Sequence, residues 1–181
     1  MEEIETPIEK IQENIHEAAH HAQENWVSKV ALFSAVVAVV AAVAALLAGH
    51  HSNEAMITQI KASDSWSYYQ AKGIKSAVLQ NKMQIIELLG KSTDNKDSEK
   101  LKSYADEQTD ISEKAKELES ESAQHLATHQ ILARAVTLFQ VAIAIAAITI
   151  LTRRKKLLFV SFGFSLVAIL FFIQSFLGTH L

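Results

Sequence analysis

The chain has 181 residues, of which 49% are hydrophobic, and its 17 basic and 20 acidic residues give a formal net charge of −3. Because a nucleic-acid-binding protein is expected to carry a strongly basic surface, the sequence predicts no nucleic-acid partner. The absence of cysteine excludes disulfides and thiolate metal sites. One proline and five glycines favour long, uninterrupted helices.

Apolar residues are concentrated in three blocks along the chain. A helix needs about 20 apolar residues to cross the hydrocarbon core of a bilayer. We therefore expect transmembrane helices at residues 27–49, 135–151 and 157–178. The predicted fold is all-α, a membrane protein with three transmembrane helices and a long extramembrane antiparallel helical hairpin. The lipid bilayer is its first expected partner.

Residues 1–26 are predicted to form an amphipathic helix on the cytoplasmic side. Thr6-Pro7-Ile8-Glu9 fits a helix-capping box. Isoleucines with a 4-3-4 spacing form one apolar stripe, namely Ile4, Ile8, Ile11 and Ile15. The stripe could lie on the membrane surface or pack against other copies of the chain. The opposite face is acidic and would be repelled by anionic lipid, which favours packing between copies.

Small residues recur with a 4-3 spacing through the first predicted span. They are Ala31, Ala35, Ala38, Ala42, Ala45 and Gly49. Such a stripe lets two helix backbones approach closely, a main source of attraction between helices in lipid. Because alanine is frequent in this segment, a second seam through Ser34, Ala41 and Ala48 stays open.

Residues 50–134 are predicted to form a helical hairpin. The turn signal is 91–97, after which a helix resumes at Ser98. The returning helix carries a coiled-coil-like 4-3 seam with several polar members. The seam comprises Tyr104, Gln108, Ile111, Ala115, Leu118, Ser122, His125, His129, Leu132 and Val136. Each helix of the hairpin has ~40 residues and would reach roughly 60 Å from the membrane. So thin a two-helix stalk is expected to pack against neighbouring copies.

Four consecutive basic residues lie in the short loop at residues 152–156. They are Arg153, Arg154, Lys155 and Lys156. Short loops rich in lysine and arginine stay on the cytoplasmic side of a membrane. Counting spans from this loop places the N-terminus in the cytoplasm and the hairpin outside it.

Three stretches of the first hairpin helix resemble a known family. They read HHSNEAM at 50–56, KASDSW at 61–66 and YYQAK at 68–72. With the acidic, histidine-bearing N-terminal segment and the late pair of spans, the chain resembles, over nearly its whole length, the bacterial membrane proteins of domain of unknown function 4337. The resemblance implies a bacterial inner-membrane protein. Together with the orientation expected from the basic loop, this predicts a multi-pass protein of the cell inner membrane with residues 50–134 in the periplasm. It implies no activity.

The eight histidines suggest a metal site. The candidate ligands stand in two pairs, one at the end of the first span and one with i, i+4 spacing on the returning helix, namely His50, His51, His125 and His129. Folding the hairpin about residue 94 would place residue 50 beside 135–138, so the two pairs would miss each other by more than a helical turn. The alternative is that these histidines are hydrogen-bonded in the helix seam without a metal.

Trp66, Tyr69 and Gly73 share one face of the first hairpin helix, and glycine permits a close approach. This patch could dock an unidentified protein partner or a glycan-like ligand. Packing between subunits of a stalk bundle is the favoured interpretation.

Enzymatic signatures are missing from the sequence. It contains no glycine-rich phosphate loop, no nucleophile elbow and no charged residue buried inside a predicted span. We therefore expect a protein that is not an enzyme and needs no cofactor. The favoured function is a non-catalytic homo-oligomeric membrane scaffold. The alternatives are an oligomeric channel or transport accessory protein, and a metal or envelope-stress sensor.

Overall fold

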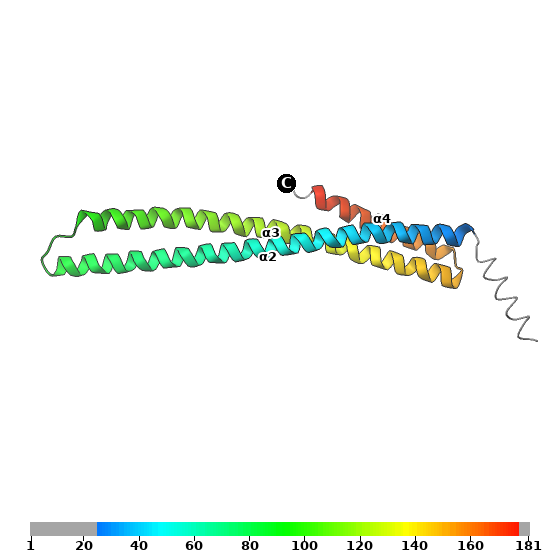
Figure 1. The fold of residues 1–181 in the computed structure, drawn as a ribbon, viewed down its shortest axis with the longest axis horizontal. Helices are drawn as coiled ribbons and strands as arrows, with labels where there is room; N and C mark the ends of the chain where they lie inside the picture. Colours follow the sequence, from blue (N-terminus) through cyan, green and yellow to red (C-terminus); the bar gives the residue numbers. More distant parts are fainter. Residues whose placement is uncertain (1–24, 178–181) are drawn as a thin grey trace, which may run out of the picture. The chain divides into compact units, whose positions relative to one another are not determined.

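The computed structural model describes residues 25–177, and the regular structure in that range is entirely α-helical. The helices are α2 (Asn25–Leu88), α3 (Asn95–Thr152) and α4 (Lys156–Leu177) (Figure 1). By length and composition, each contains a segment able to cross a membrane. The all-α fold class is thus confirmed for the described residues. The isoleucine stripe and nearly all of the predicted helix at 1–26 lie outside them.

The chain divides into two compact units, and both include parts of α2 and α3. The first unit ends at Leu47 and resumes at Ile131, so it also contains α4. The second unit is Ala48–Gln130. Both units bury mainly small side chains, and they differ in the charge of their surfaces.

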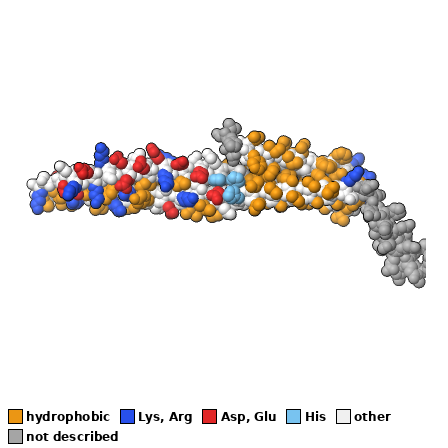
Figure 2. Space-filling model, turned by 45° about the horizontal axis from the view of Figure 1, so that its top comes forward, with side chains coloured by type: hydrophobic (Ala, Val, Ile, Leu, Met, Phe, Trp, Pro, Cys, Tyr) orange, Lys and Arg blue, Asp and Glu red, His pale blue; other side chains and the backbone are white. Residues whose placement is uncertain are grey.

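The first unit buries mostly small side chains and exposes large apolar ones. Its core cluster consists of Val37, Ala41, Ala44, Ala135, Phe139 and Ala168. Along α4, Ser161 and Ser165 are buried, whereas Phe159 is 78% exposed and hydrophobic side chains dominate the surface (Figure 2). A helix that packs in water buries its large apolar residues. Contacts through small residues are typical of helices that associate in lipid.

The small-residue seam predicted on the first span lies away from this core. All six of its members are exposed, namely Ala31, Ala35, Ala38, Ala42, Ala45 and Gly49. The buried face of α2 instead runs through Val37, Ala41 and Ala44, and Ala48 is buried as well. The alternative seam is therefore the one buried within the described chain. Alanine occurs on every face of this segment, so its spacing could not distinguish the two faces.

In the second unit, α2 and α3 run antiparallel and meet along the predicted seam. Every seam position from Tyr104 to His129 is buried or half-buried. Three polar members donate hydrogen bonds to α2 carbonyl oxygens, namely Ser122 Oγ to Ala55 at 2.7 Å, Gln108 Nε2 to Tyr69 at 3.3 Å and His129 Nδ1 to Ala48 at 2.8 Å. The polar residues that interrupt the apolar repeat therefore join the two helices, because a helical carbonyl keeps a second lone pair for such a bond.

A glycine-based cap ends α2. Gly90 has φ 72°, its N–H donates to Glu87 O at 2.9 Å, and the Lys91 N–H donates to Ile86 O at 3.1 Å. These two bonds form a Schellman motif, which needs a left-handed residue at this position.

The following helix begins at Asn95, three residues before the predicted start at Ser98. Asp94 explains the difference because it caps the helix. Its carboxylate accepts the Lys96 N–H at 3.1 Å, and its carbonyl accepts the Asp97 N–H at 2.9 Å.

Replacing Gly90 with alanine is expected to destabilise the protein by about 1 kcal/mol, since a side chain is strained in the left-handed region. Gly49→Ala is the matched control. Gly49 lies within α2, no atom lies within 4 Å of an added Cβ, and alanine is the better helix former, so this variant should be more stable than wild type. Thermal unfolding followed by circular dichroism in one detergent measures both. Equal destabilisation of the two variants would contradict the assigned cap.

Candidate functional site

The structure brings two of the four candidate histidines into direct contact. The Nδ1 atoms of His51 on α2 and His125 on α3 lie 2.9 Å apart, and the ring centroids are separated by 5.2 Å. The predicted register, with residue 50 beside 135–138, is wrong. The chain reverses earlier than residue 94, because α2 already ends at Leu88.

The contact constrains the protonation of both rings. A hydrogen bond between two Nδ1 atoms needs one N–H donor and one lone pair, so at least one of the two rings is neutral. His129 Nδ1 lies 2.8 Å from the carbonyl oxygen of Ala48, which makes this nitrogen a donor. His50 contacts the His51 ring at a centroid distance of 5.6 Å. The described histidines thus form one cluster (Figure 2).

This cluster is built from hydrogen bonds. Among the described residues, no group of three or more His, Cys, Asp or Glu side chains is placed to hold a metal ion. The geometry matches the alternative interpretation, in which histidines are hydrogen-bonded within the seam. Metal binding at these four histidines stays a prediction.

The surroundings of His51 lower its pKa below the ordinary value of 6.5. The main cause is burial, and the neighbouring His125 and His50 lower the pKa further, whereas Glu54 raises it and His129 lowers it. The unfolded chain therefore binds a proton at His51 more tightly than the folded chain does. The stabilisation is complete above about pH 6.5 and is lost as the pH falls through that value toward the folded-state pKa.

We expect the free energy of unfolding of the wild-type protein to decrease between pH 7.5 and 5.5, and His51→Gln to reduce that slope. Each unit of pKa difference corresponds to about 1.4 kcal/mol. His50→Gln is the control, because His50 is exposed and only the third cause of the His51 shift, so most of the slope should remain. Denaturant titrations at each pH measure the effect. An unchanged slope in His51→Gln would exclude His51 as its source.

The predicted aromatic patch is half-buried where α2 meets α3. Trp66 Nε1 donates to Glu119 Oε1 at 2.8 Å, and the Trp66 and Tyr69 rings meet edge to face at 5.6 Å. A Cβ on Gly73 would lie 3.0 Å from Gln108 Nε2, so glycine allows a close helix contact here. These residues have contacts within the chain, and docking of a partner stays a prediction.

Sequence reasoning missed a second cluster, centred on Lys72. Its ammonium pairs with Glu107 and lies 5.1 Å from the Tyr104 ring centroid and 5.4 Å from that of Tyr68. The hydrogen bond to Glu107 raises the pKa of Lys72, and the same bond lowers the pKa of Glu107. The residues were visible in the sequence, but only the correct hairpin register brings α2 and α3 members together.

These features define a helical protein with three potential membrane spans and a polar pair of helices joined by a hydrogen-bonded seam. The chain belongs to the family described as domain of unknown function (DUF4337), whose family model matches residues 26–178. The resemblance drawn from residues 50–72 is thereby confirmed. No curated protein and no solved structure matches the chain.

Proposed function

We propose that this protein is a non-catalytic scaffold of a bacterial inner membrane that assembles with copies of itself. The observation that carries the proposal is the inverted packing of the first unit. Leu46, Leu151 and Phe159 are 75%, 82% and 78% exposed, while alanines and serines make up most of the buried residues. In water, so extensive an apolar surface would promote aggregation. A bilayer solvates it, and helices satisfy their own backbone polar groups there.

The basic loop sets the proposed orientation. Lysine and arginine in a short loop stay on the cytoplasmic side. With Arg153–Lys156 in the cytoplasm, residues 1–26 are also cytoplasmic, and the second unit lies in the periplasm.

An exposed heptad stripe on α2 supports assembly. Its members have a 3-4 spacing and all are exposed, namely Ala71, Ile74, Val78, Asn81, Ile85 and Leu88. One core position of this heptad holds Ala71, Val78 and Ile85, and the other holds Ile74, Asn81 and Leu88, so the stripe offers a mostly apolar face to another helix. Copies that share one orientation in a membrane can pair this stripe in parallel.

The flanks of the stripe are compatible with this pairing. In a parallel pair, Lys75 and Lys82 of one copy face the uncharged Gln70 and Ala77 of the other, so no like charges oppose each other. The exposed seam that begins at Ala31 offers a further surface for contacts between copies in lipid.

The orientation can be tested with single cysteines, because the natural chain has none. In intact cells with a permeabilised outer membrane, a membrane-impermeant maleimide should label Asp94→Cys. Thr152→Cys, at the end of α3 next to the four basic residues, which stay in place, should be labelled only after the inner membrane is opened. The reverse labelling pattern would contradict the proposed orientation.

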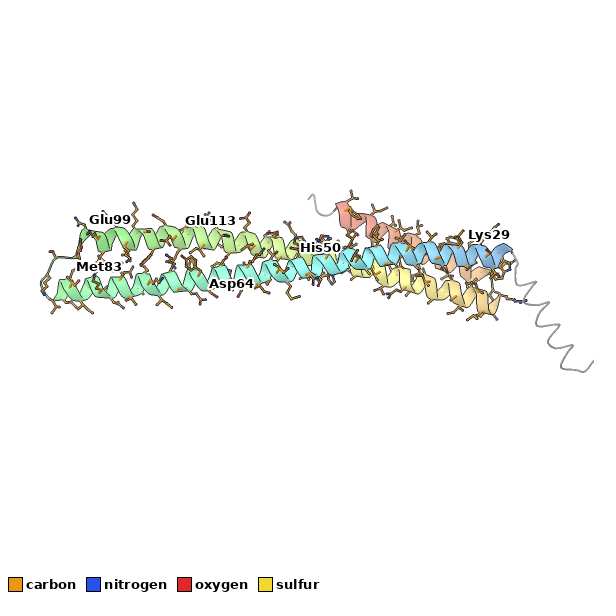
Figure 3. The ribbon with its side chains drawn as sticks, viewed as in Figure 1. Lys29, His50, Asp64, Met83, Glu99 and Glu113 are labelled. Carbon is orange, nitrogen blue, oxygen red and sulfur yellow. The ribbon has the colours of Figure 1, made fainter. Side chains whose placement is uncertain are left out.

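Assembly through the stripe predicts a disulfide-linked dimer of Val78→Cys in membranes, because equivalent core positions of a parallel pair face each other. Glu113→Cys is the control on an exposed position of α3 (Figure 3). Non-reducing electrophoresis measures the dimer fraction of each variant. Equal fractions for both variants would show random collision and would count against this interface.

Sensing is a second candidate function, favoured by the contact between His51 and His125. Their hydrogen bond cannot form when both rings are protonated. A sensor of proton concentration should therefore change the dimer fraction of Val78→Cys between pH 7.5 and 5.5, measured with an oxidant that acts at both values. A constant fraction would leave scaffolding as the function.

A further inference from the structure

We propose that the turn between α3 and α4, together with Trp26 and Lys29 of α2, binds the phosphate headgroup of an anionic phospholipid. The proposal rests on the membrane insertion proposed above. We call this set of residues, Trp26, Lys29 and Arg153–Lys156, the basic turn site.

The described part of the first unit carries positive charge with no acidic side chain to balance it. Its described residues contain no Asp or Glu, and they include Lys29, Arg134, Arg153, Arg154, Lys155 and Lys156. The two ion pairs among the described residues, formed by Lys72 and by Lys82, both belong to the second unit. A counter-charge for the basic turn site must therefore come from outside the described part of this unit.

The site is built by three helices of one unit. Arg153–Lys156 are all exposed in the turn where α3 ends and α4 begins. Lys155 Nζ lies 5.4 Å from the centre of the Trp26 ring, a cation–π contact that joins this turn to the first residues of α2. Lys29 follows one turn along the same helix (Figure 3).

The residue types suit a lipid phosphate. A guanidinium can donate two parallel hydrogen bonds to phosphate oxygens, and lysine adds point charges beside it. Tryptophan is enriched at the headgroup level of membranes. The conformation of Arg153 is also unusual, because its φ of 53° is rarely adopted by a residue with a side chain. A glycine would close the turn with less strain, whereas arginine adds a charge next to Arg154.

The position of the site favours lipid as the source of the phosphate. Basic residues directly at the cytoplasmic end of a membrane helix attract anionic lipid by about 1 kcal/mol each, roughly fivefold in affinity. The other available anion is the acidic segment at residues 1–24 of the same chain. The following experiment separates these two sources.

The chain has two tryptophans, so Trp66→Phe leaves Trp26 as the only fluorescent reporter at the site. The full-length variant is reconstituted in phosphatidylcholine bilayers that contain brominated phosphatidylglycerol, which quenches tryptophan on contact. A parallel series uses brominated phosphatidylcholine. The ratio of the quenching by brominated phosphatidylglycerol to that by brominated phosphatidylcholine measures the preference for the anionic lipid beside Trp26. We expect a preference of at least about fivefold, reduced in 0.5 M NaCl because salt screens exposed charges.

Arg154→Gln with Lys156→Gln removes two charges but keeps the contact between Lys155 and Trp26. We expect this pair to lower the preference at least about threefold. Lys100→Gln with Lys102→Gln removes the same charge from the second unit and should leave the preference unchanged. Circular dichroism confirms that both double variants keep their helical content.

The possible outcomes distinguish failure of lipid binding at the basic turn site from failure of the membrane insertion on which that proposal rests. Quenching by brominated phosphatidylcholine without any preference for phosphatidylglycerol would overturn the site alone. An equal loss in both double variants would overturn it too. A preference that emerges only after Glu2, Glu3 and Glu5 are changed to Gln would assign the counter-charge to the chain's own acidic segment, against the proposal. No quenching by either lipid would overturn both insertion and the site.

Discussion

Close approach of helix backbones through small residues is the constraint on which the other features depend. Ala41 and Ala44 are buried in the first unit, and Ala55 and Ala62 in the second. An alanine leaves the neighbouring carbonyl oxygens accessible to a side chain from another helix. Three hydrogen bonds use this access, because Ser122, His129 and Ser161 reach the carbonyl oxygens of Ala55, Ala48 and Ala142. Small residues therefore determine both the spacing of the helices and the places where polar side chains can be buried.

The same constraint decides which residues form the surface. Because alanine and serine occupy most of the contacts, many larger apolar residues point outward, as Phe159 does in the first unit and Ile74 in the second. In lipid, exposure of these apolar residues carries no free-energy penalty, because acyl chains solvate them. The helices also gain close packing. In water an outward row of apolar residues needs a partner. The apolar surface of the first unit therefore suits lipid, whereas the apolar row of the second unit suits contact with a partner in water, although α2 and α3 run through both units.

Structural features that depend on residues close together in the sequence were predicted. Features that depend on contacts between distant residues were not. Helix content, three apolar segments and the 4-3 seam of α3 follow from spacing along one helix, and all were predicted. The register of the hairpin depends on where α2 ends. The cap at Gly90 was overlooked, so the pairing of His51 with His125 and of Lys72 with Glu107 was missed. The buried face of the first span could not be chosen either, because alanine occurs on every face and the partner helix is distant in sequence.

The described parts of the two units also differ in their acidic residues. All described acidic residues, from Glu54 to Glu121, belong to the second unit. A carboxylate in a bilayer core would be costly, so its exclusion from the described part of the first unit is what insertion requires. Exclusion of acids would not by itself require basic residues, since a neutral turn could join α3 and α4 equally well. Compatibility with the membrane therefore does not by itself explain why this turn has four basic residues. The orientation of the protein in the membrane would depend on the total charge of these residues. Binding of a lipid headgroup would depend on their position beside Trp26, so the two roles require different properties of the same residues.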